Sequence, residues 1–325
     1  MKCNAVVAHE TGGPEVLKWE AVDVAPPSSG EALIRHTGVG LNFIDVYFRT
    51  GLYPSPTMPI CPGMEGAGIV EAVGENVDEV SVGDRVAYAG MPVGAYSQYR
   101  TIPSHRLMVI PEGISDETAA AMMLKGMTVE YLMDRTYKVS PGDTILLHAA
   151  AGGVGLIASQ WAKARGATVI GTVGSREKAR LAEAHGCDHT IIYTEDNFVD
   201  RVKDITQGIG VPVVYDSVGK DTLLDSIECL EPRGILVNFG QSSGKLENFD
   251  LAALAKGSFY VTRPSLMTYT ASRADLETSA NTLFDLVKNN KVTIPINNRY
   301  ELKDAAQAHS DLEGRRTTGT TVFTV

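Results

Sequence analysis

A glycine-containing turn constrains the possible folds of this chain more than any other feature. Residues 148–155 read His-Ala-Ala-Ala-Gly-Gly-Val-Gly, directly after the apolar run 144–148 and at the start of an amphipathic segment, 153–165. A glycine turn between a strand and a helix is typical of dinucleotide-binding proteins, because the helix N-terminus offers N–H groups to a pyrophosphate. The turn therefore predicts a nucleotide-binding sheet.

The turn departs from the dinucleotide fingerprint GxGxxG at its first position. The three positions are Ala150, Gly152 and Gly155, so alanine replaces the first glycine. Gly152 still lets the backbone approach a pyrophosphate, and Gly155 lets the helix pack closely on the strand. His148 belongs to the strand before the turn, where we expect it to pack in the core.

Further apolar runs follow the turn, most of them separated by segments of helical length. The runs are 167–173, 189–193, 211–215, 234–239 and 258–262, and the segments between them include 176–186, 198–205 and 223–230. This alternation predicts an α/β fold with a mostly parallel, doubly wound sheet of the Rossmann type.

The first part of the chain, up to about residue 125, has a different sequence pattern. Short alternating stretches at 31–37, 68–73 and 85–88 are separated by turn residues, which predicts a compact β-rich domain. After a helix near 276–289, the tail returns to strand-like segments that could rejoin this first domain. A chain of 325 residues is long enough for two such domains.

Composition excludes several classes of function. The net charge is −10 and no block of Lys and Arg occurs, so nucleic acid is not an expected partner. No apolar run is long enough to cross a bilayer and the first residues do not resemble a signal peptide, so we expect a cytoplasmic protein without a membrane partner. The four cysteines form no CxxC pair, which argues against disulfides and a zinc knuckle.

The end of the second predicted strand indicates which nicotinamide cofactor binds. An acid about 20 residues past the fingerprint would hold the ribose hydroxyls of NAD, but none stands at this strand end. Gly174 and Ser175 leave room there, and Arg176 or Lys178 could meet a phosphate. This pattern favours NADPH; the alternative is that both cations are solvated residues at a helix start.

Several stretches together resemble one family over essentially the whole chain. They are residues 12–17, 42–49, 63–68, 82–86, 125–129, 149–155, 215–219 and 260–264. The chain resembles the quinone oxidoreductases, the zeta-crystallin-like, zinc-free branch of the medium-chain dehydrogenase/reductases. The resemblance implies a GroES-like catalytic domain (1–126 and 265–325), a Rossmann NADPH-binding domain (127–264) and a cofactor between them.

The same resemblance predicts that no metal is bound. The zinc-dependent branch holds its catalytic metal with a Cys, a His and a Cys, and the aligned positions here are Asn42, Met64 and Leu124. These side chains are poor zinc ligands. The seven residues between Tyr88 and Tyr96 contain no cysteine, so the structural zinc lobe is missing too. A zinc dehydrogenase with unusual ligands is the rival interpretation.

Without a Lewis acid, the acceptor has to be electron-poor already. A quinone spreads the charge of an arriving hydride over its own π system, as does an alkene conjugated to a carbonyl. The predicted function is therefore an NADPH-dependent quinone reductase, with a reductase of activated alkenes as the alternative. A structural or RNA-binding relative without turnover is the less favoured class, because the glycine turn is intact. An exposed strand at 258–261 would favour a homodimer.

The resemblance also implies the site residues. Asn42 would offer an amide donor near the reaction, and Tyr47 and Tyr53 would stack on the acceptor or donate to a developing oxyanion, unless they only pack at a domain edge. Asp45 and Glu65 match acids of the wider superfamily, and we expect them to have a structural role or to support the site residues rather than to act in acid catalysis. The cofactor residues would be Phe43, Ile44, Asp45, Val46, Tyr47 and Tyr131 near the nicotinamide; Gly152, Gly153, Val154 and Gly155 at the pyrophosphate; Gly174, Ser175, Arg176, Lys178, Tyr193 and Arg315 (or its neighbour Arg316) at the adenosine phosphate; and Val218, Gly240, Gln241, Ser242, Ser243, Pro264, Ser265 and Leu266 along the ribose and nicotinamide.

Overall fold

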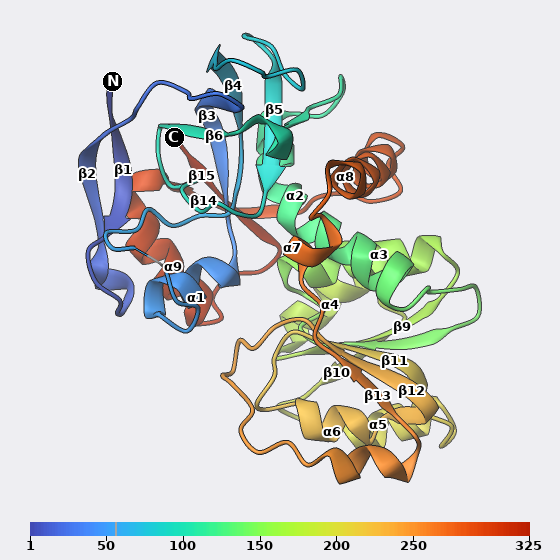
Figure 1. Cartoon of the computed structure of the whole chain (residues 1–325). Helices are drawn as coiled ribbons and strands as arrows, with labels where there is room; N and C mark the ends of the chain where they lie inside the picture. Colours follow the sequence, from blue (N-terminus) through green and yellow to red (C-terminus); the bar gives the residue numbers. More distant parts are fainter. Residues whose placement is uncertain (56) are drawn as a thin grey trace. The chain divides into compact units, whose positions relative to one another are not determined.

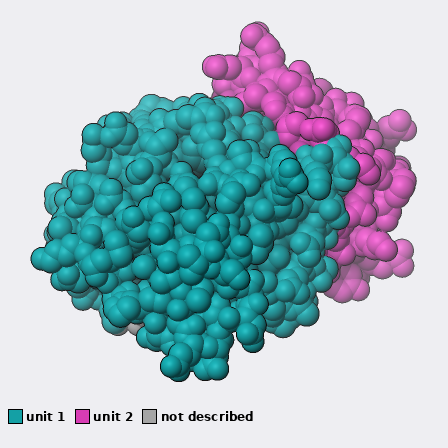
Figure 2. Space-filling model, turned by 90° about the horizontal axis from the view of Figure 1, so that it is seen from above, with its two compact units in different colours: residues 1–127, 269–289, 294–325 teal, residues 128–268, 290–293 magenta. Residues whose placement is uncertain are grey.

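The structure is a computed structural model that describes residues 1–55 and 57–325. Two compact units are distinguished (Figure 2). Unit 1 comprises Met1–Met127, Tyr269–Asn289 and Ile294–Val325, and unit 2 comprises Thr128–Thr268 and Asn290–Thr293. Each unit is a group of closely packed residues. The domain limits expected from the sequence, 1–126 with 265–325 and 127–264, stay predictions.

Unit 2 is built on a parallel sheet in the order β10-β9-β8-β11-β12-β13 (Figure 1). Its strands are β8 Thr144–Leu147, β9 Thr168–Val173, β10 His189–Ile192, β11 Val211–Asp216, β12 Leu230–Asn238 and β13 Tyr260–Thr262. The chain runs outward from β8 to β10 and then from β11 to β13 in the other direction. The predicted doubly wound α/β sheet is therefore confirmed.

Helices connect these strands, and four of them start at the predicted positions, residues 153, 176, 198 and 223. They are the π-helix Tyr131–Thr136, α3 Gly153–Ala164, α4 Arg176–Ala184, α5 Phe198–Ile205, α6 Leu223–Ile227, the 3-10 helix Leu251–Lys256 and α7 Leu266–Tyr269. Side chains cap two of them: Ser175 accepts a hydrogen bond from Lys178 N, and Asn197 accepts from Val199 N and Asp200 N. In Figure 1, α3 lies on one side of the sheet and α5 and α6 lie on the other.

The core of unit 2 consists of the apolar side chains that the strand pattern predicts to be buried. Leu146, Ile170, Val214 and Leu236 come from neighbouring strands and are fully buried, and Trp161 of α3 is buried completely. Burial of such side chains contributes about 1.5–3 kcal/mol each.

Unit 1 contains a sheet in the order β14-β15-β3-β4-β5-β7, with β6 also paired to β3, and a separate pair, β1-β2. The bounds are β1 Lys2–Ala8, β2 Leu17–Asp23, β3 Glu31–Leu41, β4 Glu65–Val73, β5 Arg85–Ala89, β6 Tyr99–Pro103, β7 Met108–Val109, β14 Ile296–Glu301 and β15 Thr320–Thr324. β15 pairs antiparallel with β3, Thr321 opposite Leu41, so the C-terminal segment lies in the same sheet as the N-terminal part.

The helices of unit 1 include the one that carries most of the predicted site residues. They are α1 Phe43–Thr50, α2 Asp116–Glu130 (which continues into unit 2), α8 Arg273–Lys288, α9 Ala305–Glu313 and the 3-10 helices Pro14–Val16, Ser104–Arg106 and Leu302–Asp304. α1 begins after Asn42 and ends at Gly51, whose φ of 80° is left-handed and suits glycine. No helix among the described residues combines the length and the hydrophobicity needed to cross a bilayer.

Candidate active site

The glycine turn of unit 2 has the tight geometry that a pyrophosphate site requires. A Cβ atom at Gly155 would lie 2.4 Å from Ala149 O and 2.6 Å from Ala150 O, and backbone atoms at this distance cannot give way. At Gly152 the nearest atom, Ala149 O, would be 3.2 Å away. The first residues of α3, Gly153 and Val154, follow at once, where helical N–H groups have no partner within the helix. The turn therefore fits a bound phosphate group.

The residues predicted to hold the adenosine phosphate lie around the end of β9. A Cβ atom at Gly174 would lie 2.7 Å from Tyr193 Oη, so glycine is what allows this tyrosine to approach. Ser175 Oγ accepts a hydrogen bond from Lys178 N at 3.3 Å at the start of α4. The structure thus brings Gly174, Ser175, Lys178 and Tyr193 together.

The guanidinium of Arg176 is engaged by an acid that sequence reasoning missed. Its Nε and NH2 groups donate to the two carboxylate oxygens of Glu195 at 3.2 and 3.1 Å. Because this pair neutralises Arg176, Lys178 becomes the favoured phosphate ligand of the two that the sequence offered. Glu195 follows β10, and nothing in the local pattern marks it.

Asp216 organises the residues predicted to line the ribose and nicotinamide. Its Oδ1 accepts hydrogen bonds from Val218 N and Gly219 N, at 2.7 and 3.0 Å, and the residue is fully buried. Ser243 Oγ donates to Val218 O at 2.8 Å, and a Cβ atom at Gly240 would lie 2.6 Å from Ser217 O. The loops after β11 and β12 are therefore held together. Asp216 stands in one of the family stretches, which was the available signal for its role.

His148 is buried, as predicted. Its Nδ1 lies 2.8 Å from Thr172 Oγ1 and its Nε2 lies 2.9 Å from Ser226 Oγ. Burial lowers the pKa of the imidazole, so His148 is neutral and holds β8, β9 and α6 together.

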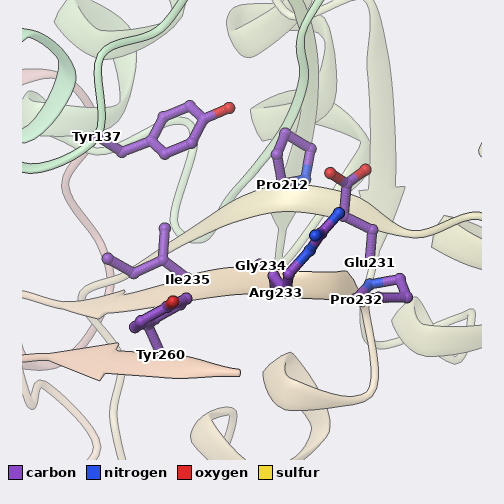
Figure 3. A pocket seen from close by; sticks show the side chains of 8 residues that line it. All are labelled: Tyr137, Pro212, Glu231, Pro232, Arg233, Gly234, Ile235 and Tyr260. Atoms are coloured by element: carbon purple, nitrogen blue, oxygen red, sulfur yellow. The ribbon is translucent and has the colours of Figure 1, made fainter. Parts of the chain in front are cut away.

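Figure 3 shows a pocket at the other end of the same sheet. It is lined by Tyr137, Pro212, Glu231, Pro232, Arg233, Gly234, Ile235 and Tyr260. Pro212 and Tyr260 stand near the amino ends of β11 and β13, whereas the predicted cofactor residues follow the carboxyl ends. Ligands of open parallel sheets bind at the carboxyl ends, so this pocket does not belong to the candidate site.

In unit 1, Asn42 is held by two buried acidic side chains. Its backbone N donates to Asp45 Oδ2 at 2.9 Å, and its amide Nδ2 donates to Glu65 Oε2 at 2.7 Å. Asn42 is only 5% exposed and both acids are fully buried. One of the two N–H groups of the amide is therefore used inside the unit, and the role of Asn42 as a donor near the reaction stays a prediction.

The predicted substrate tyrosines form an aromatic cluster on α1 and the turn after it. The ring centroids of Tyr47 and Tyr53 are 5.1 Å apart, those of Phe43 and Tyr47 are 5.7 Å apart, and those of Phe48 and Tyr53 are 5.9 Å apart. Tyr47 is buried, whereas Tyr53 is half-buried. The rings pack on one another, and their role toward a substrate stays a prediction.

Asp45 has the most perturbed carboxyl group of unit 1. Burial raises its pKa to about 7, against the hydrogen bonds from Asn42 N and Tyr96 Oη and the charge of Lys125, while Glu65 adds a smaller upward effect. Tyr96 Oη, 3.1 Å from Asp45 Oδ2, also lies 3.0 Å from His309 Nε2. Asp45 Oδ1 has no hydrogen-bond partner within the described part of the chain.

The stability of the protein should therefore depend on pH through Asp45. The folded state keeps this proton up to a pH of about 7, whereas the ordinary value is 3.8. Between these values the unfolded state binds fewer protons, so the free energy of unfolding falls as the pH rises, by up to about 1.4 kcal/mol per pH unit. Asp45→Asn removes this titration, so urea denaturation should show the variant gaining stability relative to wild type between about pH 5 and about pH 7.

A variant with the opposite sign serves as the control for that measurement. Hydrogen bonds from Tyr300, Arg316 and Gln307 lower the pKa of Asp311, so its carboxylate stabilises the fold above its ordinary pKa and loses this effect as the pH falls. Asp311→Asn should lose stability relative to wild type as the pH rises from the acid range. A stability difference between Asp45→Asn and wild type that stays constant with pH would contradict the prediction.

The remaining predicted residues are divided between the units. Tyr131 starts the π-helix and is buried, while Pro264, Ser265 and Leu266 follow β13. Arg315 follows α9 with a φ of 57°. The guanidinium of Arg316 donates to Asp311 Oδ1 at 2.7 Å and to Ser310 Oγ at 3.2 Å, which argues against Arg316 as the phosphate ligand.

The positions aligned with zinc ligands carry an amide, a thioether and an aliphatic side chain, which are poor zinc ligands. Met64 is fully buried, and the described residues contain no group of three or more His, Cys, Asp or Glu side chains that could hold a metal ion. The four cysteines are free thiols, and burial raises the pKa of Cys61 and Cys229 to about 12 and that of Cys187 to about 11. These thiols are therefore unreactive near neutral pH.

Comparisons with known proteins agree with this arrangement. Residues 28–112 match the alcohol dehydrogenase GroES-like domain, and residues 153–284 match the zinc-binding dehydrogenase family. The chain is 52% identical to a quinone oxidoreductase of Pseudomonas aeruginosa, covering 96% of both chains, and 44% identical to a 2-haloacrylate reductase of a Burkholderia species, covering 98% of both. The crystal structure of Escherichia coli quinone oxidoreductase complexed with NADPH is similar, with a TM-score of 0.96 and 46% identity over 99% of this chain and 100% of that one. The chain belongs to the quinone oxidoreductase family, the zeta-crystallin-like branch of the medium-chain dehydrogenase/reductases, with a GroES-like and a Rossmann-type part.

Proposed function

We propose that this protein is an NADPH-dependent quinone reductase that transfers reducing equivalents from NADPH to quinones without a metal. The observation that carries the proposal is the similarity to quinone oxidoreductases over nearly the whole of both chains. The glycine turn and the α1 segment, which would hold the two reactants, are both intact in this chain.

The residues of unit 2 fit NADPH. Gly152 and the start of α3 would hold the pyrophosphate, and no acid at the end of β9 repels a 2′-phosphate. Lys178 would pair with that phosphate and Val218 would contact the ribose. When bound, NADPH supplies a hydride to the acceptor.

The residues of unit 1 would act on the acceptor. Tyr47 and Tyr53 would stack on a flat ring, and a tyrosine hydroxyl can donate a hydrogen bond to the oxygen that gains charge. Asn42 would orient one of the reactants by hydrogen bonding. The protein thus positions the reactants and excludes water, and the electron-poor acceptor takes up the charge itself.

A reductase of activated alkenes is the second candidate function. It is favoured by one observation, the 44% identity to a protein named 2-haloacrylate reductase over 98% of both chains. Both functions use the same fold and the same hydride. Consumption of NADPH by the purified protein with quinones, enones and saturated ketones tests the choice, and no turnover of any quinone would contradict the proposal.

We also propose that the protein is a cytoplasmic homodimer without nucleic acid as a partner. The end strand of the unit 2 sheet, β13, exposes Tyr260 and Val261, which are 62% and 37% accessible. A strand edge with exposed apolar side chains favours pairing with a second copy. The net charge of −10 disfavours binding to a phosphate backbone.

Replacing Val261 by proline should convert the dimer into a monomer. Proline removes a backbone N–H from the strand edge and is poorly tolerated within a paired strand. Sedimentation velocity of wild type should show a dimer and that of Val261→Pro a monomer. Val109→Pro, in the edge strand β7 of unit 1, is the matched control and should leave the dimer intact. A wild-type monomer at all concentrations would contradict the dimer.

A further inference from the structure

Glu65 receives hydrogen bonds from several donors. Its Oε2 accepts from Asn42 Nδ2 at 2.7 Å and from Lys125 Nζ at 3.0 Å, and its Oε1 accepts from Leu124 N at 2.8 Å. Glu65 is fully buried, and Asn42 and Lys125 are each 5% exposed. A carboxylate with this burial is stable only when a counter-ion and hydrogen bonds compensate it, and Lys125 provides the counter-ion.

The sequence around this group leaves room for it. A Cβ atom at Gly40 would lie 2.2 Å from Glu65 Oε2 and 2.4 Å from Ala120 O, so a side chain at this position would displace the carboxylate. Gly40 has no positive φ, so its backbone alone does not explain the glycine. The Glu65 carboxylate is thus held by hydrogen bonds from Leu124 and Lys125 of α2, and the absence of a side chain at Gly40 of β3 leaves space for it.

This arrangement decides which way the Asn42 amide faces. A carboxylate only accepts hydrogen bonds, so the NH2 end of the amide has to face Glu65 and the carbonyl oxygen has to face away. If Glu65 were protonated or replaced by an amide, either orientation of Asn42 could form a hydrogen bond. The carbonyl oxygen Oδ1 then faces the backbone N–H of Asp45, in the capping box at the start of α1.

We propose that Glu65 and Lys125 are positioning residues that fix the Asn42 amide between Glu65 and the N-terminus of α1, the helix that carries Phe43 and Tyr47. Through Asn42 they hold α1 in place for the bound reactants. This inference rests on the proposed function for the role of α1, but the orientation of the amide can be measured without any ligand.

Nuclear magnetic resonance of protein with 15N-labelled asparagine measures that orientation. The Asn42 side-chain signal is identified by its loss in Asn42→Ala, and in wild type one of its protons should be shifted downfield by the Glu65 carboxylate. Glu65→Gln should remove this shift. Glu71→Gln is the matched control, because Glu71 lies on the same strand, β4, but is exposed and pairs with Arg35 at 2.7 Å. An Asn42 signal that is unchanged in Glu65→Gln would overturn the proposal.

Lys125→Met provides a second variant if Glu65→Gln does not fold. Asn42 Nδ2 and Lys125 Nζ donate to the same oxygen, Glu65 Oε2, so loss of the ammonium group should change the hydrogen bond from Asn42. The downfield Asn42 proton should therefore move from its wild-type position. An unchanged Asn42 signal in a folded Lys125→Met protein would overturn the proposal.

A double-mutant cycle tests the consequence for turnover. Glu65→Gln and Asn42→Ala should each lower kcat with a quinone by about tenfold or more. The double variant should be no slower than Asn42→Ala alone, because Glu65 acts through Asn42. If the kcat of the double variant falls by the product of the two single-variant factors, the positioning role of Glu65 is overturned. If wild type reduces no acceptor, the proposed function fails while the resonance measurement still decides the orientation of Asn42.

Discussion

Replacing Lys178 by alanine is expected to weaken NADPH binding by about ten- to a hundredfold and to leave NADH binding almost unchanged. A hydrogen bond between a cation and a phosphate contributes about 1.5–3 kcal/mol, and each 1.4 kcal/mol corresponds to a factor of about ten in Kd. NADH has no 2′-phosphate and therefore loses nothing. Wild type should accordingly bind NADPH much more tightly than NADH, which a fluorescence titration of each cofactor measures.

Arg176→Ala is the matched control for this change. Arg176 stands two positions from Lys178 on the same helix, α4, but both of its engaged nitrogens donate to Glu195. Its removal should therefore affect NADPH binding less than removal of Lys178. An equal loss of NADPH and NADH affinity in Lys178→Ala would contradict the assignment of Lys178, and a larger effect of Arg176→Ala would move it to Arg176.

Much of the fold could be predicted because its determinants are local. The glycine turn reports on sterics within a few residues: a Cβ atom at Gly155 would meet the carbonyl oxygens of Ala149 and Ala150, five or six positions earlier. The apolar runs predicted the strands of unit 2 to within one or two residues for most of them. Strand β11, Val211–Asp216, is one residue longer than the predicted run 211–215. The additional residue, Asp216, holds the loop after the strand through hydrogen bonds from Val218 N and Gly219 N.

The interactions that the sequence did not predict join residues far apart in the chain. Asn42 and Glu65 are 23 positions apart, Glu65 and Lys125 are 60 apart, and Arg176 and Glu195 are 19 apart. Each residue type is ordinary for its own segment, and only tertiary packing brings the partners into contact. Sequence reasoning therefore named Asn42, Arg176 and Glu65, but it did not predict that Glu65 bonds to Asn42 or that Glu195 pairs with Arg176.

Quinones should be reduced at least about a hundredfold faster than saturated ketones, a difference of about 2.7 kcal/mol in the activation barrier. A ketone oxygen gains a full charge when a hydride arrives, and Asn42, Met64 and Leu124 offer no thiolate or imidazole to hold a Lewis acid there. A quinone instead spreads this charge over its ring and becomes aromatic. Simple enones should fall between the two, and steady-state kcat/KM for each acceptor at saturating NADPH measures the order.

Variants of Tyr53 show how the aromatic cluster on α1 and the turn after it contributes to this order. Its ring packs against Tyr47 and Phe48, so Tyr53→Ala removes stacking area and should raise KM for a quinone more than for a small enone. Tyr53→Phe should have little effect if the ring only stacks, but should lower kcat about tenfold or more if the hydroxyl donates to a developing oxyanion. If simple enones react faster than every quinone tested, the quinone assignment is wrong. The activated-alkene function that the 2-haloacrylate reductase relative suggests would then replace it.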